Sequence, residues 1–216
     1  MDELKLSHPT LIVLTGLPGA GKSWFAREFA DTFGSPIVSL DQIRWTLFAN
    51  HTYSDNENAM VYQIAELLLA ELLKTKRSLI LDGGYNTFAA REELFKIARR
   101  AGYEILTVIV QTDEKSARLR ATHRDGRRLG DRFNQPLSSE EFAKQSADYQ
   151  PPVASRTSVV ISGKHTFATQ ARAVLKKMLE IQPPKPATDS LLAARRSAAT
   201  NATNSVAAAH QNSRLV

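Results

Sequence analysis

The 216-residue chain has no cysteine, no long apolar run and no secretory pattern in its first residues. Without cysteine the chain forms no disulfide, has no thiolate nucleophile and binds no cysteine-ligated metal. Because no run of about 18 apolar residues occurs, the sequence predicts no membrane span. The segment MDELKLSHPT is acidic and mixed rather than basic and then apolar, so we expect a cytoplasmic protein.

The net charge of +6 is divided evenly between two parts of the chain. Residues 183–216 hold four basic residues against one acidic residue, a net charge of +3, which leaves +3 for residues 1–182. A mildly basic body suits anionic ligands, although this charge is common among ordinary soluble proteins. The tail is rich in Pro, Ala, Ser, Thr and Asn and has no aromatic residue. We therefore expect a folded domain over 1–182 and a disordered tail over 183–216.

Five short apolar segments alternate with longer amphipathic ones. The apolar segments are 10–16, 36–40, 78–84, 103–112 and 158–163. They are rich in Ile, Val and Leu without strict alternation, which is typical of strands buried on both faces of a parallel sheet. Helical spacing and stop signals predict helices over 22–33, 56–77, 87–102 and 165–181. The alternation predicts an α/β domain with a doubly wound, parallel five-stranded sheet flanked by helices.

The segment TGLPGAGKSW (15–24) fits the pattern G-x-x-x-x-G-K-[ST]. The matching residues are Gly16, Gly21, Lys22 and Ser23, with Gly19 and Ala20 between them. A loop that wraps a polyphosphate with backbone N–H groups needs side chains that are small or absent. Lys22 at the start of the next helix would reach the β- and γ-phosphates, and the Ser23 hydroxyl would ligate Mg²⁺. A chance match is the alternative, but the buried strand before the segment and the amphipathic helix after it are what the mechanism demands. The sequence thus predicts a P-loop NTPase fold that binds ATP and Mg²⁺.

Two aspartates follow strands at the edge where this loop lies. Ligands of open α/β sheets bind beyond the carboxyl ends of the strands. Asp82 follows the third strand and suits an acid that holds Mg²⁺ through water, with a turn cap as the alternative. Asp41 follows the second strand and could accept a proton from an alcohol, while Arg44 on the same helix face could hold an anion. An N-cap Asp41 with a surface Arg44 fits the same spacing, and the sequence leaves both interpretations open.

Residues 114–132 carry six arginines against three acidic residues and follow the fourth strand. The segment could therefore fold over the same edge as an arginine-rich lid, exclude water and stabilise charge on a transferring phosphoryl group. Arg120 and Arg124 are four residues apart, which predicts that they share a helix face. A solvated surface with paired charges is the alternative for most of the six arginines.

The combination of these motifs resembles a known family. The motifs are Gly16 to Ser23, the pair Asp41-x-x-Arg44, the stretch LILDGGYNTFAAR and the region from Arg118 to Arg128. Together they resemble the small P-loop kinases of the AAA_33 type, a group similar to polynucleotide 5′-hydroxyl kinases, zeta toxins and antibiotic phosphotransferases. The resemblance covers residues 9–181, which is nearly all of the expected domain.

The resemblance implies roles for individual residues. Asp41 would be the base or the acid that binds the acceptor. Arg44 would touch the acceptor, and Thr87 and Arg91 would line its side of the site. Two arginines would belong to the lid, Arg120 beside the nucleotide and Arg124 as a catalytic residue.

The sequence therefore predicts a phosphotransferase that moves the γ-phosphate of ATP·Mg²⁺ to an alcohol-type acceptor, a small molecule or a nucleoside or 5′-hydroxyl end. A nucleic-acid partner is not favoured, because no basic groove with interleaved aromatic residues is present. For Trp45, Phe48 and Tyr53 we prefer core packing to stacking on a base. The chain lacks the N-K-x-D motif of GTPases and the L-S-G-G-Q signature of ABC ATPases, and its body is too short for an AAA+ motor. An ATP-binding switch or adaptor without an acceptor stays open, and neither the acceptor nor the oligomeric state is assigned.

Overall fold

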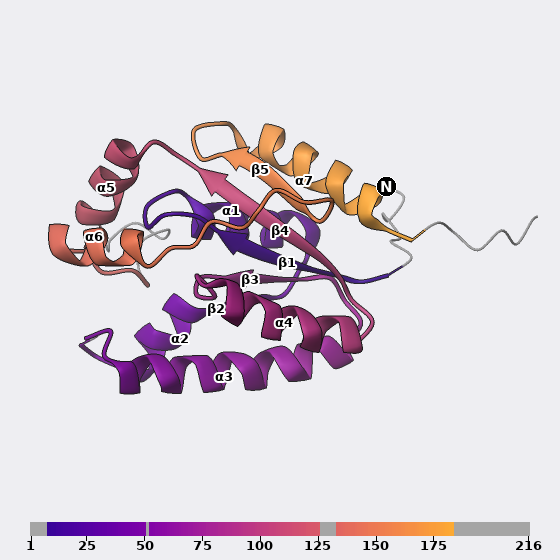
Figure 1. Cartoon of the computed structure of the whole chain (residues 1–216), viewed down its shortest axis with the longest axis horizontal. Helices are drawn as coiled ribbons and strands as arrows, with labels where there is room; N and C mark the ends of the chain where they lie inside the picture. The colour runs from indigo at the N-terminus through magenta and orange to yellow at the C-terminus, as the bar shows by residue number, and fades with distance from the viewer. Residues whose placement is uncertain (1–7, 51, 126–132, 184–216) are drawn as a thin grey trace, which may run out of the picture. The chain divides into compact units, whose positions relative to one another are not determined.

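The computed structural model describes residues 8–50, 52–125 and 133–183 (Figure 1). Five parallel strands form one sheet in the order β2-β3-β1-β4-β5. The strands are β1 (Thr10–Thr15), β2 (Ile37–Ser39), β3 (Leu79–Asp82), β4 (Glu104–Gln111) and β5 (Ser158–Ser162). The helices are α1 (Lys22–Phe33), α2 (Leu40–Leu47), α3 (Asp55–Lys74), α4 (Phe88–Arg100), α5 (Glu114–Thr122), α6 (Ser139–Ala147) and α7 (Phe167–Ile181). The predicted doubly wound, five-stranded parallel sheet is confirmed. The division at residue 182 stays a prediction, because residues 184–216 lie outside the described part of the chain.

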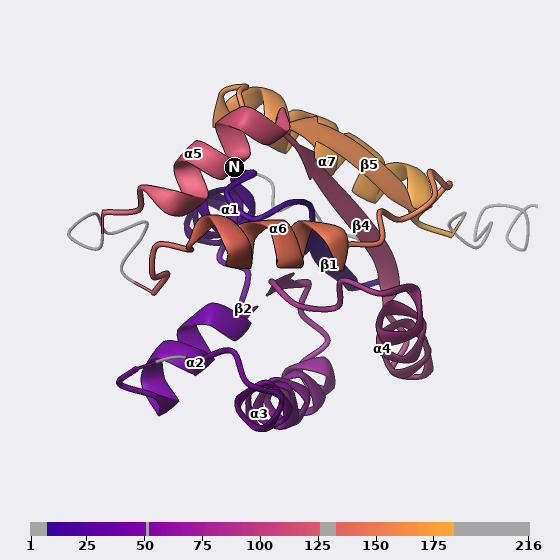
Figure 2. The ribbon, with the colours of Figure 1, turned by 60° about the vertical axis from the view of Figure 1, so that its left-hand side comes forward.

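Helices cover both faces of the sheet. Figure 2 shows α3 and α4 on one side of the strands and α1 and α7 on the other. On the first face, Val61 of α3 and Leu94 of α4 pack against β1 and β3. On the second face, Phe29 of α1 and Val174 of α7 pack against β1 and β4. Because burial of one such side chain contributes about 1.5–3 kcal/mol, these two apolar layers fix the helices on the sheet.

The central strand places the functional edge of the sheet. Every residue of β1 is buried, and its register pairs Leu11 with Leu79 and Leu14 with Asp82 of β3. On its other side β1 pairs with β4. Since all strands are parallel, their carboxyl ends meet at one edge, and α1, α2 and α5 each begin there after a strand.

The helix boundaries follow the sequence signals closely. Gly34 ends α1 with φ of 64°, and Ser54 caps α3 through a hydrogen bond from the backbone N–H of Glu57. The sequence analysis did not predict α6, although Ser138 and Glu141 form a capping box at its start. In the part of the chain that is described, no helix combines the length and the apolar character that a membrane crossing needs.

Candidate active site

The loop between β1 and α1 runs in tight contact with two neighbouring elements. A Cβ atom at Gly16 would lie 2.4 Å from the carbonyl oxygen of Val110, and one at Gly19 would lie 2.1 Å from that of Ala117. Both glycines also have positive φ, 145° and 76°. A side chain at either position would collide with backbone atoms, so only glycine is compatible with this path. The loop therefore lies against the backbone of β4 and α5 at these two glycines.

Lys22 lies over this loop as the first residue of α1. Its Nζ donates hydrogen bonds to the carbonyl oxygens of Gly16 at 2.8 Å and of Leu17 at 2.9 Å. Burial lowers the pKa of the Lys22 ammonium, and the carboxylates of Asp82 and Asp41 oppose this shift. The N-cap of α1 is a glycine that supplies no side-chain hydrogen bond, so the positive helix end faces the loop without a competing carboxylate or hydroxyl cap. These features suit an anion such as a phosphate.

Asp82 combines burial with an oxygen that has no hydrogen-bond donor. Its exposed fraction is 3%, and no donor in the described chain reaches its Oδ1. Burial raises the pKa of Asp82 to about 6, and Asp41 adds to this, whereas a hydrogen bond from the Ser23 hydroxyl opposes it. A buried carboxylate beside a hydroxyl fits a hard cation such as Mg²⁺, which usually takes one or two protein oxygens and completes its shell with phosphates and water. Accordingly, the described residues include no cluster of three or more His, Cys, Asp or Glu side chains that could hold a metal on their own.

A cavity of about 520 Å³ opens beside the loop. Its wall includes Ser23, Arg27, Arg120, His123, Arg124 and His165, together with the loop residues Gly19, Gly21 and Lys22. The lining is strongly cationic, and the carboxylate of Asp41 is also part of it. A polyphosphate bound in this cavity would therefore meet guanidinium, ammonium and backbone N–H groups.

A second cavity, of about 90 Å³, lies at the same sheet edge. Its wall includes Tyr53, Gly83, Gly84, Asn86, Gln145 and Tyr149. Lys22, Asp41 and Arg124 line this cavity and the larger one. They come from α1, from α2 and from the segment after α5, so three separate elements meet at the boundary of the two cavities.

The two lid arginines reach the larger cavity by different routes. Arg120 lies on α5 and its Nη1 donates to the carbonyl oxygen of Gly163 at 3.2 Å. The prediction that Arg124 shares its helix face is wrong, because α5 ends at Thr122 and Arg124 lies beyond it. Arg124 instead donates to the carbonyl oxygen of Gln135 at 3.3 Å.

Arg118, another arginine of segment 114–132, lines neither cavity. Arg118 pairs with Glu114 and lies over the ring of Phe142, 5.2 Å from its centroid, which is a surface role. The remaining three of the six, at positions 127, 128 and 132, lie outside the described residues.

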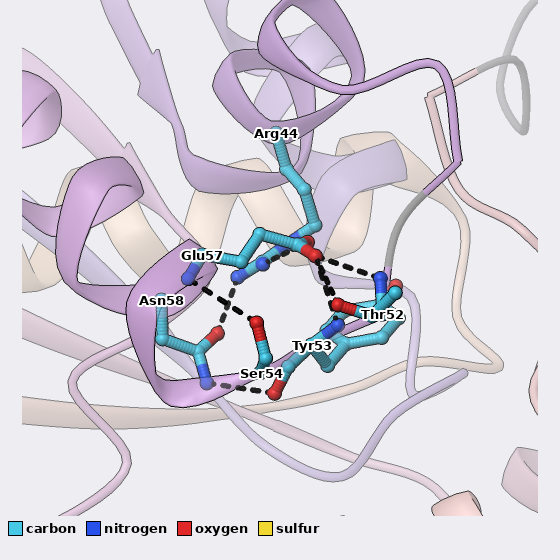
Figure 3. Close-up of polar contacts among 6 residues, drawn as sticks. All are labelled: Arg44, Thr52, Tyr53, Ser54, Glu57 and Asn58. Atoms are coloured by element: carbon cyan, nitrogen blue, oxygen red, sulfur yellow. Dashed lines mark hydrogen bonds and ion pairs between the residues drawn. The ribbon is translucent and has the colours of Figure 1, made fainter.

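Arg44 is buried against α3 and lines neither cavity, which does not support the expectation that it touches the acceptor. Figure 3 shows its side chain reaching Glu57 and Asn58 of α3. Its exposed fraction is 6%, and it forms an ion pair with Glu57 and donates to Oδ1 of Asn58 at 2.8 Å. Burial alone would raise the pKa of Glu57, but hydrogen bonds from Arg44 and Thr52 hold it below its ordinary value. The Glu57 carboxylate is thus ionised and compensates the positive charge of Arg44, so that this charge is not available to a ligand.

The Arg44–Glu57 pair shapes the loop before α3. Oε2 of Glu57 accepts hydrogen bonds from the backbone N–H of Thr52 at 2.7 Å and of Tyr53 at 3.1 Å. The Arg44 guanidinium lies 4.6 Å from the centroid of the Tyr53 ring. These contacts hold Tyr53, which lines the smaller cavity. The alternative of an Asp41 N-cap is also wrong, because Ser39 caps α2.

Arg91 is likewise committed to the structure. Its exposed fraction is 2%, and it donates to the carbonyl oxygens of Tyr85 at 3.0 Å and Gln150 at 2.7 Å. Burial lowers its pKa. Arg91 joins the segment after β3 to the segment after α6 and lines neither cavity, while Thr87 caps α4. These positions do not support the expected acceptor contacts of the two residues.

Four side chains of the smaller cavity were missed by the sequence analysis as site residues. Asn86 lies in the quoted stretch after β3, and the capping box of α6 could have placed Gln145 on a helix. Tyr149 follows α6, and no local pattern marks it. Tyr53 was assigned to core packing, but it also lines this cavity.

The other two aromatic residues considered for base stacking differ in position. Trp45 is half-exposed, and its ring lies edge-on to that of Phe133, with 5.5 Å between the ring centroids. The expectation that Trp45 packs in the core is therefore wrong. Phe48 packs against the apolar layer of α3 and α4, which confirms core packing for this residue.

Solved structures with this fold include proteins described as kinases. A putative kinase from Chloroflexus aurantiacus superposes with a TM-score of 0.64 at 17% identity, covering 79% of this chain and 99% of that one. A gluconokinase from Sinorhizobium meliloti superposes with a TM-score of 0.58 at 17% identity, covering 81% and 94%. At this identity the likeness concerns the fold, which is the P-loop kinase fold.

Two curated relatives match this chain, one over most of its length and one over about half of it. An adenylate kinase from Fusobacterium nucleatum is 27% identical over 183 residues, which are 76% of this chain and 83% of the relative. A 2′,3′-cyclic-nucleotide 3′-phosphodiesterase from Pongo abelii is 30% identical over 105 residues, 48% of this chain. The chain spans only 24% of that relative's length. The matches agree with a P-loop kinase and name no common acceptor.

The family follows from the sequence itself. Residues 11–152 match the family model AAA_33, described as an AAA domain. Since this match extends over more than half of the chain, the protein belongs to that family.

Proposed function

We propose that the protein transfers the γ-phosphate of ATP to a hydroxyl acceptor, with Mg²⁺ as the metal. One observation carries the proposal: Lys22, Asp41 and Arg124 line both the larger and the smaller cavity. A phosphoryl group that moves from a nucleotide in one cavity to an acceptor in the other must pass these three side chains. Positioning and charge stabilisation at that point are the main means by which proteins accelerate phosphoryl transfer.

The larger cavity is the nucleotide side in this proposal. The backbone of Gly16, Gly19, Ala20 and Gly21 surrounds the phosphates, and Lys22 neutralises their charge. Arg120 approaches the nucleotide from α5. Ser23 and Asp82 hold Mg²⁺, which, when bound, offsets negative charge on the phosphates.

The smaller cavity is the acceptor side, and Asp41 is the base. As the acceptor oxygen forms its bond to the γ-phosphorus, its proton moves to the Asp41 carboxylate and ADP leaves with the electrons of the broken P–O bond. The guanidinium of Arg124 stabilises the charge on the phosphoryl group in transit. Arg44 supports this arrangement from behind, because it holds the loop that carries Tyr53.

An ATP-binding switch is the second candidate, because the smaller cavity, of about 90 Å³, is compact and admits water. Water alone could therefore serve as the acceptor. In that case the protein would hydrolyse ATP and phosphorylate no other molecule.

The test is phosphoryl transfer with and without Asp41. The protein is incubated with ATP·Mg²⁺ and a set of polyols, sugars, nucleosides, antibiotics and 5′-hydroxyl oligonucleotides, and products are identified by mass. Asp41→Asn should lower transfer about 10²-fold or more while ATP still binds. Asp31→Asn is the matched control, because Asp31 is exposed on α1 and lines neither cavity.

The outcomes separate the two candidates. Unchanged transfer by Asp41→Asn would remove this residue as the base. ATP hydrolysis without any phosphorylated acceptor would favour the switch.

A further inference from the structure

The acceptor side of the site is lined largely by neutral hydrogen-bonding groups. Asn86 and Gln145 offer carboxamides, and Tyr53 and Tyr149 offer phenols. Burial raises the pKa of Tyr53, and the nearby Asp41 adds to this, so its phenol stays uncharged at neutral pH. Carboxamides and phenols each donate and accept hydrogen bonds. Hydroxyl groups of a ligand need such partners, because a hydroxyl is itself both donor and acceptor.

Two arginines near this cavity are bound to protein groups that do not line it. The charge of Arg44 is compensated by buried Glu57, as Figure 3 shows. Nη1 and Nη2 of Arg91 donate hydrogen bonds to two backbone carbonyl oxygens. Turning either side chain toward a ligand would leave buried polar groups without partners, which is strongly unfavourable.

The cations that do line the cavity are shared with the nucleotide side. Lys22 and Arg124 belong to both walls, so the phosphates of a nucleotide compete for them. Asp41 adds a negative charge at the same boundary. Among the residues that the structure describes, a phosphate or carboxylate on the acceptor would thus find no cation of its own, and burying an unpaired charge is costly.

These observations point to the acceptor class. We propose that the acceptor is an uncharged polyhydroxy compound, a polyol or a sugar, and not a phosphorylated or carboxylated molecule. This inference rests on the proposed phosphotransferase function. The cavity is compact, about 90 Å³, which suits a small polyol or one edge of a monosaccharide.

Matched acceptor pairs test the inference. Glycerol is compared with glycerol 3-phosphate, ribose with ribose 5-phosphate, and glucose with gluconate, each with ATP·Mg²⁺ and the full chain. We expect kcat/KM for a neutral member to exceed that of its anionic partner at least about 10-fold, since an ionic group without a partner costs at least that much.

A charge placed in the cavity should shift this preference. Gln145→Arg supplies a cation on the acceptor side and should move the ratio of kcat/KM values at least about 10-fold toward the anionic member of a pair. Gln63→Arg, on an exposed position of α3, is the matched control and should leave the ratio unchanged. Circular dichroism and ATP affinity confirm that each variant is folded, and the ratio for the unmodified protein is informative even if a variant does not fold.

The failures are distinguishable. A preference for anionic acceptors would overturn the acceptor class and leave the phosphotransferase function standing. An unchanged ratio in folded Gln145→Arg would also overturn it, because the acceptor would then bind elsewhere. ATP binding without transfer to any acceptor would overturn both proposals.

Discussion

Replacement of Asp82 by asparagine should make the protein more stable at neutral pH while it weakens the proposed metal site. In the folded chain the pKa of Asp82 is about 6, against 3.8 ordinarily, because burial and the neighbouring Asp41 disfavour the charged form. A protein that contains an acid whose pKa is raised in the folded state loses stability as the pH rises. The contribution of Asp82 is fully present below pH 3.8 and is lost through pH 6. Asparagine has no such ionisation.

The magnitude follows from the two pKa values. A difference of about 2.2 pKa units corresponds to about 3 kcal/mol once both states are ionised. The ionisation of Asp82 should thus cost about 3 kcal/mol at pH 7.5 but only about half of that at pH 5. Weakened hydrogen bonding to Ser23 should subtract about 1 kcal/mol from the gain at either pH. We expect Asp82→Asn to be about 2 kcal/mol more stable at pH 7.5, with an advantage about 1 kcal/mol smaller at pH 5.

The assay is urea unfolding at the two pH values without nucleotide or Mg²⁺. The fluorescence of Trp24 and Trp45 reports the transition, and the free energy of unfolding is compared between the two proteins. Asp31→Asn, on the exposed side of α1, should show no pH-dependent difference. An asparagine variant that is less stable at pH 7.5, or a gap that is equal at both pH values, would refute the argument. With ATP·Mg²⁺ present, the unmodified protein should gain more stability than the variant, because a ligand that binds the folded state more tightly stabilises it more.

Two further substitutions test the phosphate loop and the loop before α3. Lys22→Ala should abolish phosphoryl transfer and keep the circular dichroism spectrum, because it removes the ammonium that faces both cavities; full activity would exclude this role. Glu57→Gln should lower the free energy of unfolding by about 3–5 kcal/mol in urea, because it leaves Arg44 buried without its anion. Glu71→Gln, which disrupts an exposed pair with Lys74, should change it by less than about 1 kcal/mol, and an equal loss in both variants would contradict the role of burial.

The fold could be predicted because its signals are local. Each strand of a parallel sheet is buried on both faces and is therefore an uninterrupted apolar run, and each main helix carries its own start and stop residues. The order of the strands could not be predicted in this way, since it depends on which helix covers which face. Helix α6 was missed because it is short and mostly polar, and its capping box is its main local signal.

Site residues could be predicted where they come after a strand. They could not be predicted where their positions depend on partners that are distant in the sequence. Lys22 and Asp41 come soon after a strand, Arg124 follows the helix after the fourth strand, and the structure brings the three together; their roles stay predictions. The spacing of Asp41 and Arg44 shows that they lie about one helical turn apart. It cannot show that Glu57, on another helix, takes up the charge of Arg44. The positions of Gln145 and Tyr149 depend on how α6 packs, which no nearby residue indicates.

The two halves of the site are supported in different ways, and this bears on how such a protein could be re-engineered. The phosphate loop lies closest to β4 and α5 at Gly16 and Gly19, where main-chain atoms leave no room for a side chain. The wall of the smaller cavity depends on a specific side-chain pair, because Arg44 and Glu57 together hold Tyr53. A redesign of the smaller cavity would therefore keep both glycines and change Arg44 and Glu57 only together.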